Sequence, residues 1–141
     1  MPVMSLEELL RSSLEGVNRE FQEADQALHS EVVRTSDALS KITEGVVQVK
    51  LGLISEDENG IIYSFSIDAK KSNHALLGVF LVSVKGFPIM FGPDAKLVKR
   101  GEDSVTIRDL SQLRDFFHNM ASNPDSPLIQ KVAYVMRKKS G

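Results

Sequence analysis

Apolar residues recur every three or four positions along the first third of the chain, from Ser5 to about Glu44, and no proline interrupts them. They form a narrow stripe through Leu10, Leu14, Val17, Phe21, Ala24, Leu28, Val32, Thr35, Leu39 and Ile42. This spacing is typical of one face of an α-helix. Ser5, followed three residues later by Glu8, fits a capping box at the helix start. The pattern therefore predicts a long N-terminal helix over residues 5–44.

A helix of this length exceeds what a small sheet can cover. It would be about 60 Å long at 1.5 Å per residue, so either part of it projects or it breaks, at Gly16 or around His29 and Ser30. Glycine costs only about 1 kcal/mol relative to alanine inside a helix, so Gly16 permits a break without requiring one.

The narrowness of the stripe indicates how the helix is used. A narrow stripe suits a seam between two helices better than the broad face of a helix lying on a sheet. We therefore predict a homodimer. Its interface would contain Leu10, Leu14, Val17, Phe21, Ala24 and Leu28. In the alternative, Phe21 packs on the sheet of its own chain.

The apolar period changes to two residues after Gly45, which is placed to end the helix as a left-handed C-cap. Alternation predicts antiparallel strands over residues 46–55 and 61–68, joined at Asn59-Gly60, the strongest short hairpin signal. The most apolar stretch lies between His74 and Phe91. In it one face would carry Leu76, Gly78, Phe80, Val82 and Val84, and the other Leu77, Val79, Leu81, Ser83 and Lys85. Apolar residues on both faces predict an interior strand.

A fourth strand is predicted over residues 87–91. Pro88 has no amide to give to a ladder, so we place this strand at an edge of the sheet. The apolar fringe of this edge, formed by Phe87, Met90 and Phe91, is a candidate for binding a protein partner by strand addition or through an apolar patch. The alternative is ordinary packing of these residues against the C-terminal helices.

Two helices are predicted at the C-terminal end of the chain. Residues 95–107 would form a small hairpin or an exposed loop before them. Thr106 followed by Asp109 fits a second capping box, and Asn123-Pro124 would stop the helix that it starts. Ser126 offers an N-cap for the last helix, with Pro127 at the first helical position.

The order of helix, strands and helices predicts an α+β fold with a two-layer arrangement, in which helices cover one face of a four- to five-stranded antiparallel meander. With 141 residues the chain suits one domain, 1–141. Within it we assign residues 5–44 to the N-terminal helical segment, 46–107 to the sheet and 107–139 to the C-terminal helices.

Composition adds limits on location and charge. The chain has no cysteine, its N-terminus lacks the basic and apolar regions of a secretory signal, and residues 74–84 are too few to span a membrane. We expect a soluble, cytoplasmic protein. Residues 1–45 hold four basic and nine acidic residues, a net charge of −5, whereas residues 96–141 hold nine basic and five acidic residues, a net charge of +4. These two parts could face each other, within one chain or between two.

Candidate chemistry is sparse. The three histidines, His29, His74 and His118, are far apart in the sequence, and no glycine pattern fits a phosphate-binding loop. We therefore expect no catalytic residue, no cofactor and no metal site. Basic residues cluster at Lys70-Lys71, Lys96, Lys99-Arg100 and Arg137-Lys138-Lys139. Aromatic residues make up only 6% of the chain and include no tryptophan, so nucleic acid is not an expected partner.

These observations favour a non-enzymatic interaction module that is homodimeric through its N-terminal helix and binds a protein partner. The alternative is a small-molecule-binding or enzymatic domain with a cleft between sheet and helices. Its polar groups would come from Tyr63, Ser83, His74 or His118.

Overall fold

The computed structural model describes residues 3–69 and 72–140, and it confirms the predicted α+β class. The helices are α1 (Leu6–Ile42), α2 (Ala95–Arg100), α3 (Leu110–Ser122) and α4 (Pro127–Ser140). The strands are β1 (Val47–Asp57), β2 (Gly60–Ala69), β3 (Ser72–Ser83), β4 (Gly86–Gly92) and β5 (Val105–Ile107).

The five strands form one antiparallel sheet in the order β1-β2-β3-β4-β5, so each strand pairs with the next one in the chain. Asp57 pairs with Gly60 across the turn between β1 and β2, where Gly60 has a φ of 135° that disfavours any side chain. The hairpin therefore forms at the predicted Asn59-Gly60 signal. β3 lies in the middle of the sheet, as its apolar residues predict.

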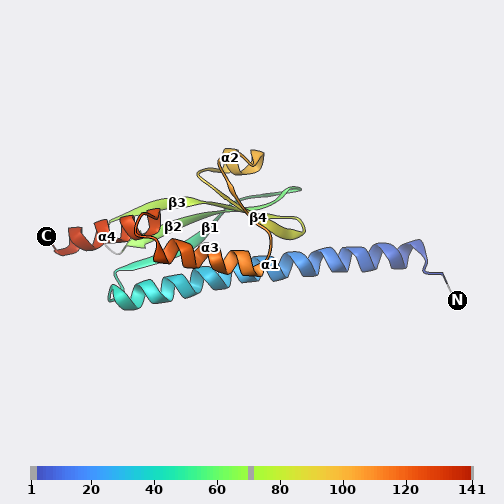
Figure 1. Cartoon of the computed structure of the whole chain (residues 1–141). Coiled ribbons are helices and arrows are strands. Elements are labelled where there is room, and N and C mark those ends of the chain that lie inside the picture. The colour runs from blue at the N-terminus through green and yellow to red at the C-terminus, as the bar shows by residue number, and fades with distance from the viewer. Residues whose placement is uncertain (1–2, 70–71, 141) are drawn as a thin grey trace.

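Helices cover the two faces of the sheet unequally. α1, α3 and α4 lie on one face, and the short α2 lies on the other (Figure 1). Val98 of α2 packs there against a small apolar cluster formed by Ile62, Val79 and Leu81. The main layers are thus the sheet and the three longer helices, with α2 as a partial cover on the opposite face.

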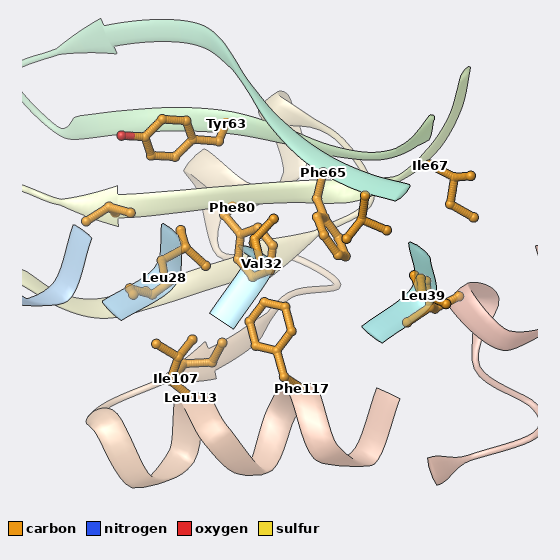
Figure 2. Close-up of a cluster of buried hydrophobic side chains, with 14 of the residues drawn as sticks. Leu28, Val32, Leu39, Tyr63, Phe65, Ile67, Phe80, Ile107, Leu113 and Phe117 are labelled. Carbon is orange, nitrogen blue, oxygen red and sulfur yellow. The ribbon is translucent and has the colours of Figure 1, made fainter. Parts of the chain in front are cut away.

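The main core lies between the sheet and the longer helices. The rings of Phe65 and Phe80 are 5.5 Å apart, and each lies about 6 Å from Phe117 of α3, at 6.0 and 5.9 Å respectively. Leu28 and Val32 of α1 point into the same cluster (Figure 2). Aromatic packing between β2, β3 and α3 therefore joins the sheet to its helical layer.

α1 is continuous from Leu6 to Ile42, which excludes both of the breaks that the sequence left open. It begins where predicted, since the Ser5 hydroxyl accepts a hydrogen bond of 3.2 Å from the Glu8 amide. At the other end Glu44 and Gly45 take left-handed conformations, with φ of 53° and 79°. The C-cap is Thr43, so Glu44 occupies the left-handed position directly after it, one residue before the predicted Gly45, whose amide donates to the Ser40 carbonyl at 2.7 Å.

The region between β4 and α3 differs from both predicted forms, a hairpin or an exposed loop. The Asp94 carboxylate accepts a hydrogen bond of 2.8 Å from the Leu97 amide and starts α2, and Gly101, with φ of 68°, ends it. β5 follows and pairs with β4. The cap of α3 is Asp109, which accepts from the Gln112 amide at 2.9 Å. The prediction of Thr106 as the capping residue is wrong, because β5 contains it.

The faces assigned to the first part of β3 also need correction. A register irregularity where β3 meets β2 interrupts the alternation between Leu76 and Gly78. Leu77 therefore packs against the main core, whereas the sequence had placed it on the face opposite Phe80. The missing side chain of Gly78 leaves the space that the Phe91 ring occupies. From Val79 onward the predicted faces hold, with Phe80 and Val82 in the main core.

Candidate interaction site

α1 crosses the helical face of the sheet from β1 to β4. Near its C-terminal end, the hydroxyls of Ser36 and Thr43 accept hydrogen bonds from β1 amides. Farther back along the helix, Gly86 of the β3–β4 turn lies so close that an added Cβ would be 2.5 Å from the Glu20 carbonyl oxygen and 2.8 Å from the Ala24 Cβ. Gly86 is therefore a position that tolerates no side chain beneath α1.

Beyond Glu20 the helix leaves the sheet. Its N-terminal half projects past the rest of the molecule, with the N-terminus at the far end (Figure 1). Three leucines at four-residue intervals, Leu6, Leu10 and Leu14, are exposed along this half by 72%, 55% and 64%. Side chains four residues apart lie on one side of a helix, so these leucines form a continuous apolar line.

The predicted dimer interface is divided between this line and the core. Ala24 and Leu28 are completely buried under the sheet of their own chain, so they have no surface to offer a second copy. Phe21 is half-buried and packs at the edge of the main core. Leu10, Leu14 and, in part, Val17 remain accessible. The role of these three residues in an interface stays a prediction.

The predicted partner-binding edge is not an edge. β5 pairs with β4, and Met90 faces Thr106 and Phe91 faces Val105 in the register. The three residues also do not form one patch: Met90 packs with the α2 cluster, whereas Phe87 and Phe91 pack with the main core on the opposite face. The sequence left this fifth strand open between a small hairpin and a loop, because three residues carry too little periodicity to decide between them.

A groove of about 310 Å³ lies between the sheet and the helical layer, where α3 turns into α4. Its apolar lining is Leu77, Phe91, Phe116, Met120, Pro127 and Leu128, and its polar lining is Asn119, Asn123, Asp125 and Ser126. Tyr63, Ser83 and His118, which the sequence suggested as polar groups of a cleft, do not line this groove. The side chain of His74 lies outside the described part of the chain. The Ser126 hydroxyl is already used, since it donates to the Met120 carbonyl at 2.6 Å. The groove thus combines an apolar wall with a few polar groups at the turn between α3 and α4.

Tyr63 belongs instead to a small polar cluster between β2 and α1. Its hydroxyl donates a hydrogen bond of 2.7 Å to Asp25, and its ring lies edge-on to His29 at 5.1 Å. The His29 Nε2 is 3.7 Å from the same carboxylate. Burial, followed by the bond to Asp25, raises the pKa of Tyr63 well above its ordinary range. A phenol held protonated in this way links α1 to β2 through its hydrogen bond to Asp25. It is a poor nucleophile.

Metal-binding and membrane-spanning features are missing from the part of the chain that the structure describes. No group of three histidine, cysteine or acidic side chains within residues 3–69 and 72–140 is placed to hold a metal ion. No helix in these ranges is long and apolar enough to cross a membrane. Of the predicted basic clusters, Lys70 and Lys71 lie outside the described residues, and Lys99 is 3.5 Å from Asp57.

Comparison of the chain with protein-family models, with curated proteins and with solved structures finds no match. The interpretation of function therefore depends on the surfaces of the molecule itself.

Proposed function

We propose that this protein is a non-enzymatic interaction module that forms a homodimer through the N-terminal half of α1 and presents its α+β body to a protein partner. One observation carries the proposal. The apolar stripe that is buried at Ala24 and Leu28 continues without a change of pattern through Leu14 and Leu10, where the sheet no longer covers it. A second surface is needed to cover these leucines.

Helix stability supports the same conclusion. Isolated helices shorter than about 12–15 residues are marginal in water, and most helical stability in proteins comes from packing of an apolar face. The projecting half is about this long and has no packing partner among the described residues. Burial of its leucines against another helix would supply the missing stabilisation.

A second copy of the same helix is the partner that fits best. The stripe is narrow, as in helices that pair along a seam, and a two-fold axis would let each copy cover the leucines of the other. Glu7 and Arg11 are 3.0 Å apart on the same helix, so charges beside the stripe are matched within one chain. The seam itself can then be apolar.

The test is the mass of a variant in solution. Replacement of both Leu10 and Leu14 by glutamate should give a folded monomer, because both side chains are exposed and their loss removes nothing from the core. Light scattering at tens of micromolar should report 15.6 kDa for this variant and twice that mass for the natural chain. Ser12→Glu is the matched control: it adds a charge on the opposite side of the same helix and should leave the dimer intact.

Two outcomes would contradict the proposal. The natural chain could have the mass of a monomer, or the double variant could remain a dimer with an unchanged circular dichroism spectrum. The second outcome would show that the copies meet through another surface.

Binding of a small apolar ligand is a second candidate function, favoured by the groove at Phe91, Phe116 and Met120. The fluorescent dye 1-anilinonaphthalene-8-sulfonate is a suitable probe for an apolar groove. Met120→Lys should abolish dye binding by placing a charge in the wall, whereas His118→Lys, on the exposed side of α3, should not. Equal dye fluorescence in both variants would exclude the groove as the binding site.

A further inference from the structure

The outer edge of β1 is closed at one end and open at the other. The Val47 amide donates to the Thr43 hydroxyl at 3.0 Å, and the Val49 amide donates to the Ser36 hydroxyl at 3.2 Å. Amides that point away from the sheet alternate along an edge strand, so the next ones belong to Leu51 and Leu53. Within the described residues no hydrogen bond covers the outer edge at these two positions.

The direction of α1 explains this difference. The helix lies beside β1 at Ser36 and Thr43 but passes under the sheet toward β4, where it meets Gly86 at Glu20 and Ala24. It therefore covers the edge of β1 only at its beginning. A groove of about 260 Å³ opens between them, lined by His29, Val32, Val33, Ser36 and Asp37 of α1 and by Val49, Lys50 and Leu51 of β1.

We propose that this groove binds an extended peptide segment of a protein partner, which adds to β1 as a sixth strand of the sheet. Unpaired backbone groups at an edge provide the affinity in this mode of recognition, and neighbouring side chains provide the specificity. Exposed apolar side chains stand in the groove wall, at Val33, and farther along the open edge, at Leu53 and Ile54, with Leu53 exposed by 66%. The proposal extends the partner-binding part of the function proposed above and uses a surface separate from the projecting half of α1.

The charges around the groove define the chemistry of the peptide. Asp37 stands in the groove wall, and Glu56 and Glu58 follow farther along β1 and its hairpin turn, beyond the residues that line the groove. The nearby Lys50 lies 3.8 Å from Asp68, so its charge is partly matched within the sheet. Acidic residues therefore lie beyond both ends of the open stretch of β1, at Asp37 and at Glu56 and Glu58. The matching segment has apolar side chains in its middle and a lysine or arginine at each end.

A second copy of β1 fits the groove poorly. The regular stretch of open edge is short, because α1 covers the edge at Val49 and a register irregularity lies between Leu53 and Ser55, so two copies of β1 cannot pair along their length. The acidic hairpin turn of each copy would also approach Asp37 of its partner. A short peptide that pairs only with residues 51–53, before the irregularity, avoids the covered part of the edge and the repulsion between like charges.

The binding experiment uses three synthetic peptides and the full natural chain labelled with nitrogen-15. The first peptide is Lys-Val-Thr-Val-Thr-Val-Arg with blocked ends, the second replaces both basic residues by glutamate, and the third carries N-methyl groups on alternate amides. The first should shift the amide signals of Leu51 and Leu53. The second should bind at least about tenfold more weakly because its charges are reversed. The third should not bind, because it cannot form the strand ladder.

Substitutions in β1 test the same site from the other side. Leu53→Pro removes an amide that points outward, a place where edge strands accept proline, whereas Leu53→Ala removes only the side chain. Binding of the basic peptide should be lost in the first variant and weakened about threefold or less in the second. The N-methylated peptide tests the ladder on the natural chain even if Leu53→Pro impairs folding.

Three results with the peptides would overturn the proposal: equal binding of the basic and acidic peptides, binding of the N-methylated peptide, or shifts confined to signals outside β1 and the groove. Loss of the dimer in the Leu53→Pro variant would also overturn it, by assigning the edge to a second copy. The variant with Leu10 and Leu14 replaced by glutamate should still bind the peptide. The peptide-binding proposal can therefore hold even if the dimer proposal is wrong, and the two proposals are tested independently.

Discussion

The two halves of α1 carry the same apolar pattern and have opposite environments. Leu28 is completely buried beneath the sheet, whereas Leu14, two heptads earlier on the same stripe, is 64% exposed. The difference does not come from helix propensity or from spacing, because the helix is continuous and the stripe keeps its period. It comes from where the sheet ends. A helical stripe thus indicates that a face will be covered without indicating which surface covers it.

The largest expected contrast between the halves is in the cost of shortening a leucine. Leu28→Ala should lower the free energy of unfolding by about 3 kcal/mol, because it leaves a cavity in the core. Leu14→Ala should change the stability of the monomer by about 0.5 kcal/mol or less, as for other exposed positions. Urea denaturation at low protein concentration measures both. Similar losses of unfolding free energy in the two variants would mean that the projecting half of α1 packs against the sheet or the other helices of its own chain.

Phe21 stands at the boundary between the halves, half-buried at the edge of the core. Phe21→Glu should lower the free energy of unfolding by about 2 kcal/mol, somewhat less than the loss of a fully buried ring would cost together with its cavity. It should also weaken the dimer, since the ring continues the line of Leu10 and Leu14. Circular dichroism reports the fold and light scattering reports the mass. An unfolded chain would place Phe21 wholly in the core, and a stable, fully dimeric variant would place it outside the seam.

The bond between Tyr63 and Asp25 fastens the second half of α1 to the sheet. Tyr63→Phe should therefore lower the free energy of unfolding by about 1 kcal/mol at neutral pH, a typical value for one hydrogen bond. The raised pKa of Tyr63 adds a dependence on pH. Because the folded chain holds the phenol proton more tightly than the unfolded chain does, this stabilisation is complete below the ordinary pKa of 10.0 and is lost as pH rises above it.

Urea denaturation at pH 8 and pH 11 distinguishes the contribution of the Tyr63 phenol to stability from the contributions of other titrating groups. The loss of stability between these two values should be smaller in the Tyr63→Phe variant than in the natural chain. An equal loss would show that lysines and other groups account for the alkaline effect and that the buried bond contributes nothing to it.

The smallest expected effect is at Gly16, in the projecting half. A Cβ at this position would meet no atom within 4 Å, so the glycine is not required by any contact within the chain. Gly16→Ala should favour the helical state of residues 6–20 by up to about 1 kcal/mol. Hydrogen exchange should show slower exchange of these amides, with the denaturation midpoint of the body unchanged. Faster exchange would mean that the glycine serves a contact outside the monomer.

Sequence reasoning succeeded where the signal is local. The cap at Ser5 and the hairpin at Asn59-Gly60 depend on neighbouring residues, and the structure places both as predicted, whereas the second face of β2 is buried at Ile62 and Ser66, where the alternation indicated water. It failed where the outcome depends on distant segments. Whether Ala24 is core or interface depends on Gly86, which no pattern within α1 can reveal.

The features that sequence reasoning left open or missed also depend on distant segments, with the exception of α2. β5, which the sequence left open between a hairpin and a loop, is fixed by its pairing with β4, and the bulge in β3 is fixed by β2. α2 did have a local signal, in Asp94 as its N-cap and Gly101 as its C-terminal glycine, but six residues are too few for an apolar period. The open edge of β1 depends on the path of α1 across the sheet, and only the structure gives that path.

The meander order of the sheet also affects how the chain folds. Each strand pairs with its neighbour in sequence, so every hairpin closes a short loop at small entropic cost. The seating of Ala24 against Gly86 instead joins segments about 60 residues apart, which is the kind of contact that slows folding. We expect the hairpins to form early and α1 to dock late. Substitutions in β2 and β3 should then slow folding in stopped-flow experiments, whereas those at Ala24 should mainly speed unfolding.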